Sequence, residues 1–451
     1  MPVQQAEDRV DVDALIARFR EHTARIGVIG LGYVGLPLLR TAAERGFSML
    51  GVDIDRGKVD VLNAGGSYIG HIGADIIAGL RAARRFEATD DFSRLSEVDA
   101  IILCVPTPLT RQREPDLTYV ERTTESIAPH LRRGQLVVLE STTYPGTTRE
   151  VMQPILEMSG FQSGRDFFLA YSPEREDPGN AEFATSNIPK VVGADGPDAL
   201  RLACALYHEL VAKTVPVTSL ETAEAVKLTE NIFRSVNIAL VNELKIVFEA
   251  MGIDVWEVIE AAKTKPFGYM PFYPGPGLGG HCIPIDPFYL TWKAREYDIA
   301  TRFIELAGEI NTAMPRRVVD KTVAALSERA GRALNGAQVL IVGVAYKKNV
   351  DDPRESPALK IMEFFEQRGA KASFHDPHLA KIPQTREHPT LNGRSSLPLT
   401  EATLAAIDVA VICTDHDVID YALLVGKCPL IIDTRNVCAR RGLSSERVVK
   451  A

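Results

Sequence analysis

The sequence lacks the features that mark membrane, secreted or nucleic-acid-binding proteins. No apolar run approaches the ~20 residues that span a bilayer. The N-terminus has no basic region followed by an apolar segment, so we expect no secretory signal. Positive charge is in deficit, because 51 Lys and Arg face 59 Asp and Glu for a net charge of −8. We therefore expect neither nucleic acid nor a membrane as the main partner.

Cysteine is also scarce, and its six positions show no paired spacing such as CxxC. Neither a disulfide framework nor a metal site is expected, and the pattern fits a reducing, cytoplasmic location. What the chain does have is length. At 451 residues it exceeds what one hydrophobic core supports, so we expect two or three domains.

One cysteine stands in an unusual setting, a stretch that reads GPGLGGHCIPIDP from 275 to 287. Glycine allows positive φ and close approach, so we expect a shaped loop rather than a helix or strand. Cys282 follows His281 and precedes Asp286 by four residues, which are the parts of an activated nucleophile. The alternative is a cysteine that only packs, although this loop has few apolar side chains to pack with.

The N-terminal part carries a dinucleotide-binding pattern. An apolar strand enters Gly30-x-Gly32-x-x-Gly35, a helix follows, and the next strand closes at Asp53. This order predicts a Rossmann unit whose glycine turn and helix N-terminus receive a pyrophosphate. Asp53 is expected to accept from the ribose hydroxyl and to repel a 2′-phosphate, which favours NAD, whereas Arg56 nearby is the feature that weakens this preference.

Further strand–helix units follow, with strands expected at 99–105, 135–140, 167–171 and 188–192. Functional side chains in such sheets gather past the carboxyl ends of strands. Thr107, Thr142, Glu174 and Glu176 occupy such positions. Taken alone, the threonines are better explained by capping of the next turn, and solvent exposure explains Glu174 equally well.

From 221 to 251 the alternation gives way to one long, largely apolar helix. A polar stripe at spacings of 3, 4 and 3 residues runs along it. The stripe is either a solvated face or the wall of a cleft. Its members are Glu224, Lys227, Asn231 and Arg234.

A second α/β unit begins near 338 and lacks the GxGxxG spacing, and its further strands are expected near 372–375, 407–413 and 430–433. Four cations follow its strands, either as phosphate contacts or as plain surface charges. They are Lys347, Lys348, Arg354 and Arg435. We therefore expect an α/β chain with two Rossmann-like doubly wound domains, 1–213 and 319–451, joined by a central helical domain, 214–318.

Seven motifs in chain order resemble the UDP-glucose/GDP-mannose 6-dehydrogenase family. They are GLGYVGLPL at 30–38, VPTP at 105–108, EST at 140–142, YSPERE at 171–176, EAVKLTEN at 224–231, GGHCIPID at 279–286 and AYKKNVDDPRES at 345–356. The stretches GGHCIPIDPFYL and SPEREDPGN resemble the branch that acts on UDP-N-acetylglucosamine. The resemblance implies an N-terminal NAD domain, a central helical domain that forms a homodimer, and a C-terminal domain that binds the UDP moiety.

The resemblance also implies a reaction, the NAD-dependent four-electron oxidation of the sugar C6 alcohol to a carboxylate for surface polysaccharide precursors. It implies that Cys282 forms a thiohemiacetal and then a thioester, and that Lys227 and Asn231 stabilise the oxyanion. Asp286 and Thr142 would order a water, and Glu174 would act in hydrolysis. The implied substrate contacts are Glu174, Arg175, Glu176, Lys227, Asn231, Arg234, Gly279, Tyr346 and Lys347. The implied cofactor contacts are Gly30, Leu31, Gly32, Tyr33, Val34, Gly35, Asp53, Thr107, Thr142 and Arg354.

Three alternatives stay open. The first keeps the chemistry and changes the sugar to UDP-glucose, UDP-N-acetylmannosamine or UDP-N-acetylgalactosamine. The second is a 3-hydroxyacid-type dehydrogenase, which has a similar NAD domain but needs no thiol loop. The third is a non-catalytic nucleotide-sugar sensor, which has no need of an activated thiol.

Overall fold

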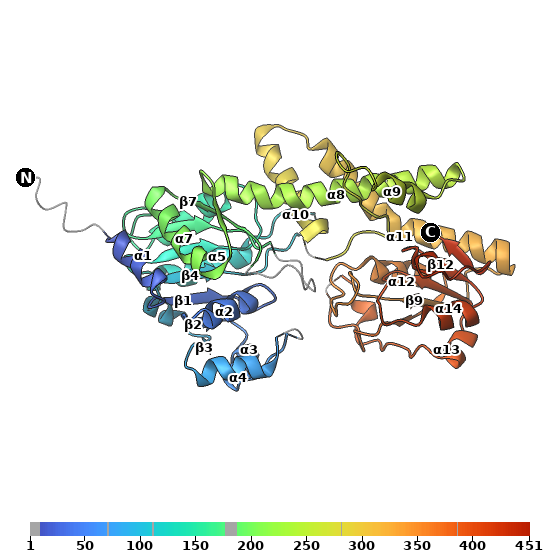
Figure 1. Ribbon diagram of the computed structural model, residues 1–451, viewed down its shortest axis with the longest axis horizontal. Helices are drawn as coiled ribbons and strands as arrows, with labels where there is room; N and C mark the ends of the chain where they lie inside the picture. The colour runs from blue at the N-terminus through green and yellow to red at the C-terminus, as the bar shows by residue number, and fades with distance from the viewer. Residues whose placement is uncertain (1–9, 70–71, 111, 176–186, 281, 386) are drawn as a thin grey trace, which may run out of the picture. The chain divides into compact units, whose positions relative to one another are not determined.

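The computed structural model describes residues 10–69, 72–110, 112–175, 187–280, 282–385 and 387–451. The chain divides into two compact units (Figure 1). The first unit is Met1–Glu230 with Phe288–Asp298, and the second is Asn231–Pro287 with Ile299–Ala451. In the described residues, no helix is long and apolar enough to cross a membrane.

The first unit is built on a sheet of eight described strands in the order β3-β2-β1-β4-β5-β6-β7-β8. All neighbouring strands are parallel except β6 and β7. The first six follow the 3-2-1-4-5-6 order of a dinucleotide-binding sheet. The strands are β1 (Arg25–Ile29), β2 (Ser48–Val52), β3 (Phe86–Thr89), β4 (Ala100–Leu103), β5 (Leu136–Leu139), β6 (Phe168–Tyr171), β7 (Lys190–Ala194) and β8 (Thr214–Pro216).

Successive residues of a strand point to opposite faces of the sheet. Both faces of this sheet carry apolar residues, and helices cover both of them. On β5, Leu136 and Val138 join one hydrophobic cluster, which includes residues of α2 and α7. Val137 and Leu139 join another cluster, which includes residues of α5 and α6. The helices of this unit are α1 (Val12–Arg20), α2 (Gly35–Glu44), α3 (Arg56–Asn63), α4 (Ala74–Ala82), α5 (Thr118–Ile127), α6 (Gln153–Glu157) and α7 (Pro197–Leu210).

Two helices contribute residues to both units. The long helix α8 (Leu220–Ala250), green in Figure 1, crosses from one unit to the other after Glu230. The helix α10 (Cys282–Ala294) crosses after Pro287. Between them lies α9 (Val255–Ala262), and α11 (Arg302–Ala330) leads into the second sheet.

The second unit contains a parallel sheet in the order β10-β9-β11-β12-β13. Residues of β9 again alternate between two hydrophobic clusters, so this sheet is also covered on both faces. Its strands are β9 (Gln338–Val342), β10 (Lys371–His375), β11 (Val409–Ile412), β12 (Ile431–Asp433) and β13 (Val448–Lys450), and its helices are α12 (Pro357–Gln367), α13 (Glu401–Ala405), α14 (Tyr421–Lys427) and α15 (Val437–Arg440).

The predicted fold class is confirmed, with two doubly wound sheets and a central helical part. One local prediction is wrong. The glycine-rich loop does not extend through Cys282, which is the first residue of α10. Proline at 284 is compatible with this, because the first turn of a helix does not need that N–H.

Candidate active site

The β1–α2 turn has the shape that a pyrophosphate requires. Gly30 has φ +88°, and a Cβ there would lie 2.5 Å from the Cys104 carbonyl oxygen. A Cβ on Gly35 would lie 2.0 Å from the Gly30 carbonyl oxygen, so helix and turn pack too closely for a side chain. Over Gly32, by contrast, a Cβ would meet no described atom within 4 Å. A phosphate therefore has room to approach the α2 N-terminus, where the N-cap residue Val34 has no acceptor atom to compete for the amides.

Asp53 lies past β2 and is 6% exposed. Its carboxylate accepts from Leu31 N at 2.8 Å and from Asp55 N at 2.9 Å, and Lys58 Nζ lies 3.5 Å away. The carboxylate is thereby fixed beside the glycine turn. The turn also involves Tyr68, whose hydroxyl donates to the Leu31 carbonyl oxygen. These residues fit NAD, whose adenosine ribose would be held by Asp53. Arg56 is directed elsewhere, because its guanidinium lies 3.5 Å from Asp90.

Two loops continue this edge of the sheet past β4 and β5. Ser141 Oγ donates to the Val105 carbonyl oxygen at 2.7 Å, which ties the loop of Thr142 to the loop of Thr107. Thr107 is buried and its carbonyl oxygen accepts from the Tyr289 hydroxyl, whereas Thr142 is half-buried. Both threonines therefore lie past strand ends, as their positions in the sequence predict.

A buried ion network lies at the same edge. Lys190, the first residue of β7, is 3% exposed, and its Nζ donates to Glu140 at 2.9 Å and to Glu174 at 3.1 Å. Glu140 is 1% exposed and also accepts from the Tyr207 hydroxyl. Glu174 is thus held by a buried cation, and a freely solvated position for it is excluded.

The charges in this network depend on one another. Burial raises the pKa of Glu140, and the Lys190 ammonium opposes that rise. Burial acts to lower the pKa of Lys190, but Glu140 and Glu174 outweigh it and raise the pKa. Lys190 therefore stays charged at neutral pH, and its charge is what allows a carboxylate to remain at Glu140.

The main chain of the Glu174 loop is held by α8. Lys227, which is 6% exposed, donates from Nζ to the Glu174 carbonyl oxygen. Arg175 donates to Glu230 at 2.6 Å and to the Pro189 carbonyl oxygen at 2.6 Å. The structure thus brings Glu174, Arg175 and Lys227 together in the first unit. Glu176 and His281 lie outside the described residues.

The polar stripe on α8 is not a solvated face, because Glu224, Lys227 and Asn231 are buried and Arg234 is half-buried. Glu224 is fully buried and accepts from Gly146 N at 2.6 Å, Thr148 N at 2.9 Å and the Thr148 hydroxyl at 2.6 Å. Burial raises the pKa of Glu224 to about 7, against the effect of these bonds. Glu224 therefore fixes the turn that follows β5 rather than facing a cleft.

Further along the stripe, Asn231 is fully buried and Asp286 is 1% exposed. Asn231 Nδ2 donates to Asp286 Oδ2, and Arg234 donates to Asn231 Oδ1. The two bonds assign the orientation of the Asn231 amide, because Asp286 accepts from its nitrogen and Arg234 donates to its oxygen. Asp286 lies four residues after Cys282, about one turn along α10.

The glycine-rich loop packs closely on the second unit's sheet edge. Gly280 has φ +79°, and its N–H donates to the Arg354 carbonyl oxygen at 3.0 Å. A Cβ on Gly279 or Gly280 would lie 2.7 or 2.9 Å from atoms of the Tyr346 side chain. The predicted substrate residues Gly279 and Tyr346 are therefore in contact, and Lys347 follows Tyr346 past β9.

Two arginines of this edge have partners. Arg354, predicted as a cofactor contact, forms an ion pair with Asp352 at 2.6 Å. Arg435 donates from Nε to the Cys413 carbonyl oxygen at 2.8 Å, and its guanidinium would lie 2.6 Å from a Cβ on Gly275. The sequence identified Arg435 only as one of four cations that follow the strands. The available signal for its contact was Gly275, because the Arg435 guanidinium leaves no room for a side chain there.

The second sheet has an acid in the place where the first has Asp53, but this acid is already occupied. Asp376 follows β10 and accepts from Val344 N, Ala345 N and His416 Nε2 at 2.7, 3.1 and 3.1 Å. His416 Nδ1 accepts from Asn349 N at 2.9 Å, so Nε2 is the nitrogen that donates to Asp376. These bonds occupy the Asp376 carboxylate, which is therefore not available to a ribose hydroxyl. The absence of GxGxxG spacing likewise indicates that this sheet has no second dinucleotide site.

Sequence reasoning missed Lys190 and Tyr207, and it named Glu140 only as part of a motif. The available signal was a lysine within an otherwise apolar predicted strand, NIPKVVG. A charge in a buried strand requires a partner, and its partners are the two glutamates past neighbouring strands.

Comparisons with known proteins place the whole chain in one context. Three domain models of the UDP-glucose/GDP-mannose dehydrogenase family match: the NAD binding domain at residues 24–211, the central domain at 221–313 and the UDP binding domain at 340–440. A UDP-N-acetyl-D-glucosamine 6-dehydrogenase of Pseudomonas aeruginosa is 38% identical, with 78% of this chain and 82% of that protein covered. A UDP-N-acetyl-D-mannosamine dehydrogenase of Salmonella typhi is 35% identical, with 91% and 98% covered. Among solved structures, a UDP-D-ManNAc dehydrogenase of Pyrococcus horikoshii is similar with a TM-score of 0.83 and 33% identity, covering 94% of this chain and 97% of that one.

Proposed function

Because the chain belongs to the UDP-glucose/GDP-mannose dehydrogenase family, whose members are NAD-dependent UDP-sugar dehydrogenases, we propose that it oxidises the C6 alcohol of UDP-N-acetylglucosamine to the carboxylate. The product is UDP-N-acetylglucosaminuronic acid, a precursor for surface polysaccharides. Two of the most similar relatives are named for sugars with an acetamido group at C2, and they differ in the configuration at that carbon.

The proposed reaction has four steps that balance. NAD+ accepts a hydride in each of the two oxidations. The alcohol first loses a hydride and a proton to give the aldehyde, and the Cys282 thiol adds to that carbonyl as a thiohemiacetal. A second loss of hydride and proton gives a thioester. Water then releases the carboxylic acid and returns the thiol, so one sugar yields two NADH.

Each proposed role corresponds to a feature of this chain. Cys282 is the first residue of α10, and helix N-termini in general lower the pKa of cysteine thiols. Lys227 and Asn231 lie one turn apart on α8 and supply an ammonium and an amide for the developing oxyanion. Glu174, held by Lys190, is the proposed group for hydrolysis, with Asp286 and Thr142 ordering the water.

The observation that carries this proposal is the hydrogen bond from Asn231 to Asp286. The amide of Asn231 on α8 and the carboxylate of Asp286 on α10 are both buried, and they form a hydrogen bond with each other. Burying an amide and a carboxylate is costly unless they are hydrogen-bonded, and this bond fixes the carboxylate of Asp286 on the helix that begins at Cys282. A 3-hydroxyacid-type dehydrogenase has no such requirement, because it forms no thioester.

The test is NADH formation with a panel of UDP-sugars, with each product weighed by mass spectrometry. We expect two NADH per UDP-N-acetylglucosamine, and at least a ~10-fold lower kcat/KM for UDP-glucose. A pocket built for the acetamide leaves a polar group unpaired when only a hydroxyl arrives, and one such group costs about 1–3 kcal/mol. Equal activity on the two sugars contradicts the substrate assignment but leaves the chemistry intact.

The same assay tests the thiol. Cys282→Ala should abolish acid formation and keep NAD+ affinity. Cys204→Ala is the matched control, because this half-buried thiol lies on α7 and burial raises its pKa. Full turnover by Cys282→Ala would contradict the covalent mechanism. If the wild type bound UDP-sugars without any turnover, the non-catalytic sensor would be favoured.

The preference for the N-acetylglucosamine configuration over N-acetylmannosamine and N-acetylgalactosamine is part of the proposal. It is supported by the motif GGHCIPIDPFYL and by the Pseudomonas aeruginosa relative. Arg234, whose guanidinium is anchored to Asn231, is the proposed acetamide contact. Arg234→Lys should narrow the difference in kcat/KM between acetamido and plain sugars, while Arg316→Lys on α11 serves as a control on an exposed surface.

We also propose that α8 forms a homodimer. Phe233, Leu240 and Val247 are 47%, 51% and 45% exposed and recur every seven residues, so they form one apolar row. Light scattering should report a dimer for the wild type and a monomer for Leu240→Glu. The control is Val418→Glu in the second unit, where the valine is 69% exposed, and this variant should remain a dimer. A dimer that survives Leu240→Glu contradicts this surface.

A further inference from the structure

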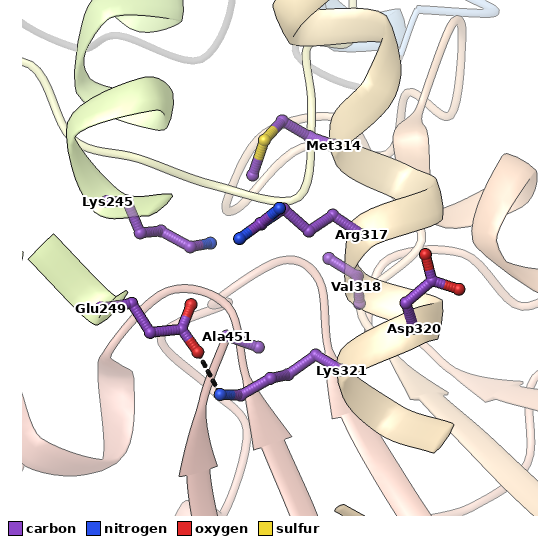
Figure 2. A pocket seen from close by; sticks show the side chains of 8 residues that line it. All are labelled: Lys245, Glu249, Met314, Arg317, Val318, Asp320, Lys321 and Ala451. Atoms are coloured by element: carbon purple, nitrogen blue, oxygen red, sulfur yellow. Dashed lines mark hydrogen bonds and ion pairs between the residues drawn. The ribbon is translucent and has the colours of Figure 1, made fainter. Parts of the chain in front are cut away.

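A pocket of about 230 Å³ lies between α8 and α11, within the second unit and apart from every residue assigned above (Figure 2). Lys245 comes from α8, and Arg317 and Lys321 come from α11, one turn apart. Figure 2 shows the charged ends of Lys245 and Arg317 directed toward each other across the pocket. Two cations that converge on one space raise each other's energy unless an anion lies between them.

Within the described chain, neither Lys245 nor Arg317 has a hydrogen bond or ion pair to another residue. Lys245 is 7% exposed, which makes it a buried ammonium without a partner. Buried charges are ordinarily paired, because an unpaired one loses its hydration and gains nothing in return. Arg317 is exposed and lies where the pocket meets solvent.

The two acidic side chains that line the pocket form ion pairs with other residues. Glu249 forms an ion pair with Lys321 (Figure 2), and Asp320 forms one with Arg368 at 2.7 Å. Ala451 also lines the pocket, and no ion pair joins it to either cation in the described residues. Lys245 and Arg317, on two different helices, therefore have no ion-pair partner among the described residues of the lining.

Burial lowers the pKa of Lys245 to about 8. Among the charges that face it, Glu249 opposes this shift, whereas Arg435, Arg317 and Lys321 add to it. An anion in the pocket would stabilise the ammonium and raise this pKa. Anion binding near pH 8 is therefore expected to take up protons, which provides an observable specific to Lys245.

We propose that this pocket binds a phosphate dianion, either free or as the terminal group of a small phosphate monoester. Two uncompensated cations match the two charges of the dianion. A guanidinium offers the forked donors that suit phosphate oxygens, and an ammonium adds a point charge. The volume, about 230 Å³, lies below the ~300–1,000 Å³ typical of pockets for drug-sized ligands, which favours a small anion over a whole nucleotide sugar. This site is independent of the dehydrogenase chemistry.

The experiment is titration calorimetry of the full chain with inorganic phosphate, with glycerol phosphate as the monoester, and with chloride at equal ionic strength. Repeating the titration at pH 8.5 in two buffers of different ionisation enthalpy measures proton uptake. We expect binding of both phosphates, no binding of chloride, and a tighter complex for whichever form is the natural source. Arg317→Gln and Lys245→Met should each weaken phosphate binding by about 10–100-fold, and Lys245→Met should also abolish the proton uptake.

Arg316→Gln is the matched control. Its guanidinium lies on the same helix, stacked 5.1 Å from the centre of the Phe364 ring, and does not line the pocket. Arg317 is exposed, so its variant tests the site even if Lys245→Met alters stability. Three results overturn the proposal: equal heats for phosphate and chloride, equal losses for Arg316→Gln and Arg317→Gln, or displacement of phosphate by UDP, which would make the pocket part of the nucleotide site.

Discussion

Replacing Lys190 with methionine is the sharpest test of the buried network in the first unit. Methionine keeps the length and apolar stem of lysine but removes the ammonium that donates to Glu140 and Glu174. Glu140 is then left with the Tyr207 hydroxyl as its remaining partner in this network, in a site that is 1% exposed. An uncompensated carboxylate remains buried in the sheet edge.

The magnitude follows from that geometry. Removing one partner of a buried ion pair costs about 3–5 kcal/mol, because the other charge stays desolvated. Burial already raises the pKa of Glu140, and loss of the cation raises it further. A carboxyl with a raised pKa destabilises the fold once it ionises, so the loss is smallest at low pH and grows as pH rises through the folded-state pKa.

The assay is denaturant unfolding of the full chain, followed by circular dichroism at pH 5 and pH 8. We expect Lys190→Met to lose about 3–5 kcal/mol at pH 8 and clearly less at pH 5. Lys190→Met with Glu140→Gln should recover much of the loss, because Glu140, the more deeply buried of the two acids, is then neutral. Arg175→Met is the control: its pair with Glu230 is partly exposed and should cost at most ~1 kcal/mol. Equal losses at both pH values would refute the reasoning.

Three further predictions concern other groups. Lys227→Ala should lower kcat more than it raises KM, since its charge matters most as the oxyanion develops, and steady-state kinetics that show a change in KM alone would contradict this. Asp53→Asn should narrow the preference for NAD+ over NADP+, measured as the ratio of kcat/KM, because the carboxylate that repels a 2′-phosphate is gone; an unchanged ratio assigns that preference to another group. The pKa of Glu224 is raised from 4.5 to about 7, so this group should lower the stability of the fold as the pH rises from about 4.5 to about 7. Glu224→Gln should remove that part of the pH dependence in unfolding experiments, and identical pH profiles would disprove the assignment.

Sequence patterns predicted the sheets well because a buried parallel strand is a short apolar run with a fixed length. The strands expected at 135–140 and 407–413 were found at Leu136–Leu139 and Val409–Ile412. The short edge strands β3, β8 and β13 were not predicted. Edge strands have only one neighbour and less burial, so their sequences carry a weaker apolar signal. The three-domain partition stays a prediction, beside the two compact units of the structure.

The site was harder to predict than the fold, because its contacts join residues that are distant in the chain. The glycine turn and Asp53 were identified from spacing, since 22 residues separate Leu31 from the acid that its N–H contacts. The Lys190 network joins residues 50 and 16 positions apart, which no periodicity encodes. The end of the glycine-rich loop was misjudged because glycine content reports backbone freedom, not the position where helical hydrogen bonds begin.

The helix α8 shows why a periodic pattern alone cannot separate an interior face from an exterior one. A polar stripe on a soluble protein usually faces water, yet Glu224, Lys227 and Asn231 are all buried. The exposed residues of the same helix include Phe233 and Leu240. Periodicity gives the direction in which apolar residues point but not what lies there. Here the buried polar residues each have a specific acceptor or donor, Thr148, the Glu174 carbonyl oxygen and Asp286. Such bonds can be satisfied at only one register of the helix, so α8 is fixed by its polar stripe, and its apolar row is left for another surface.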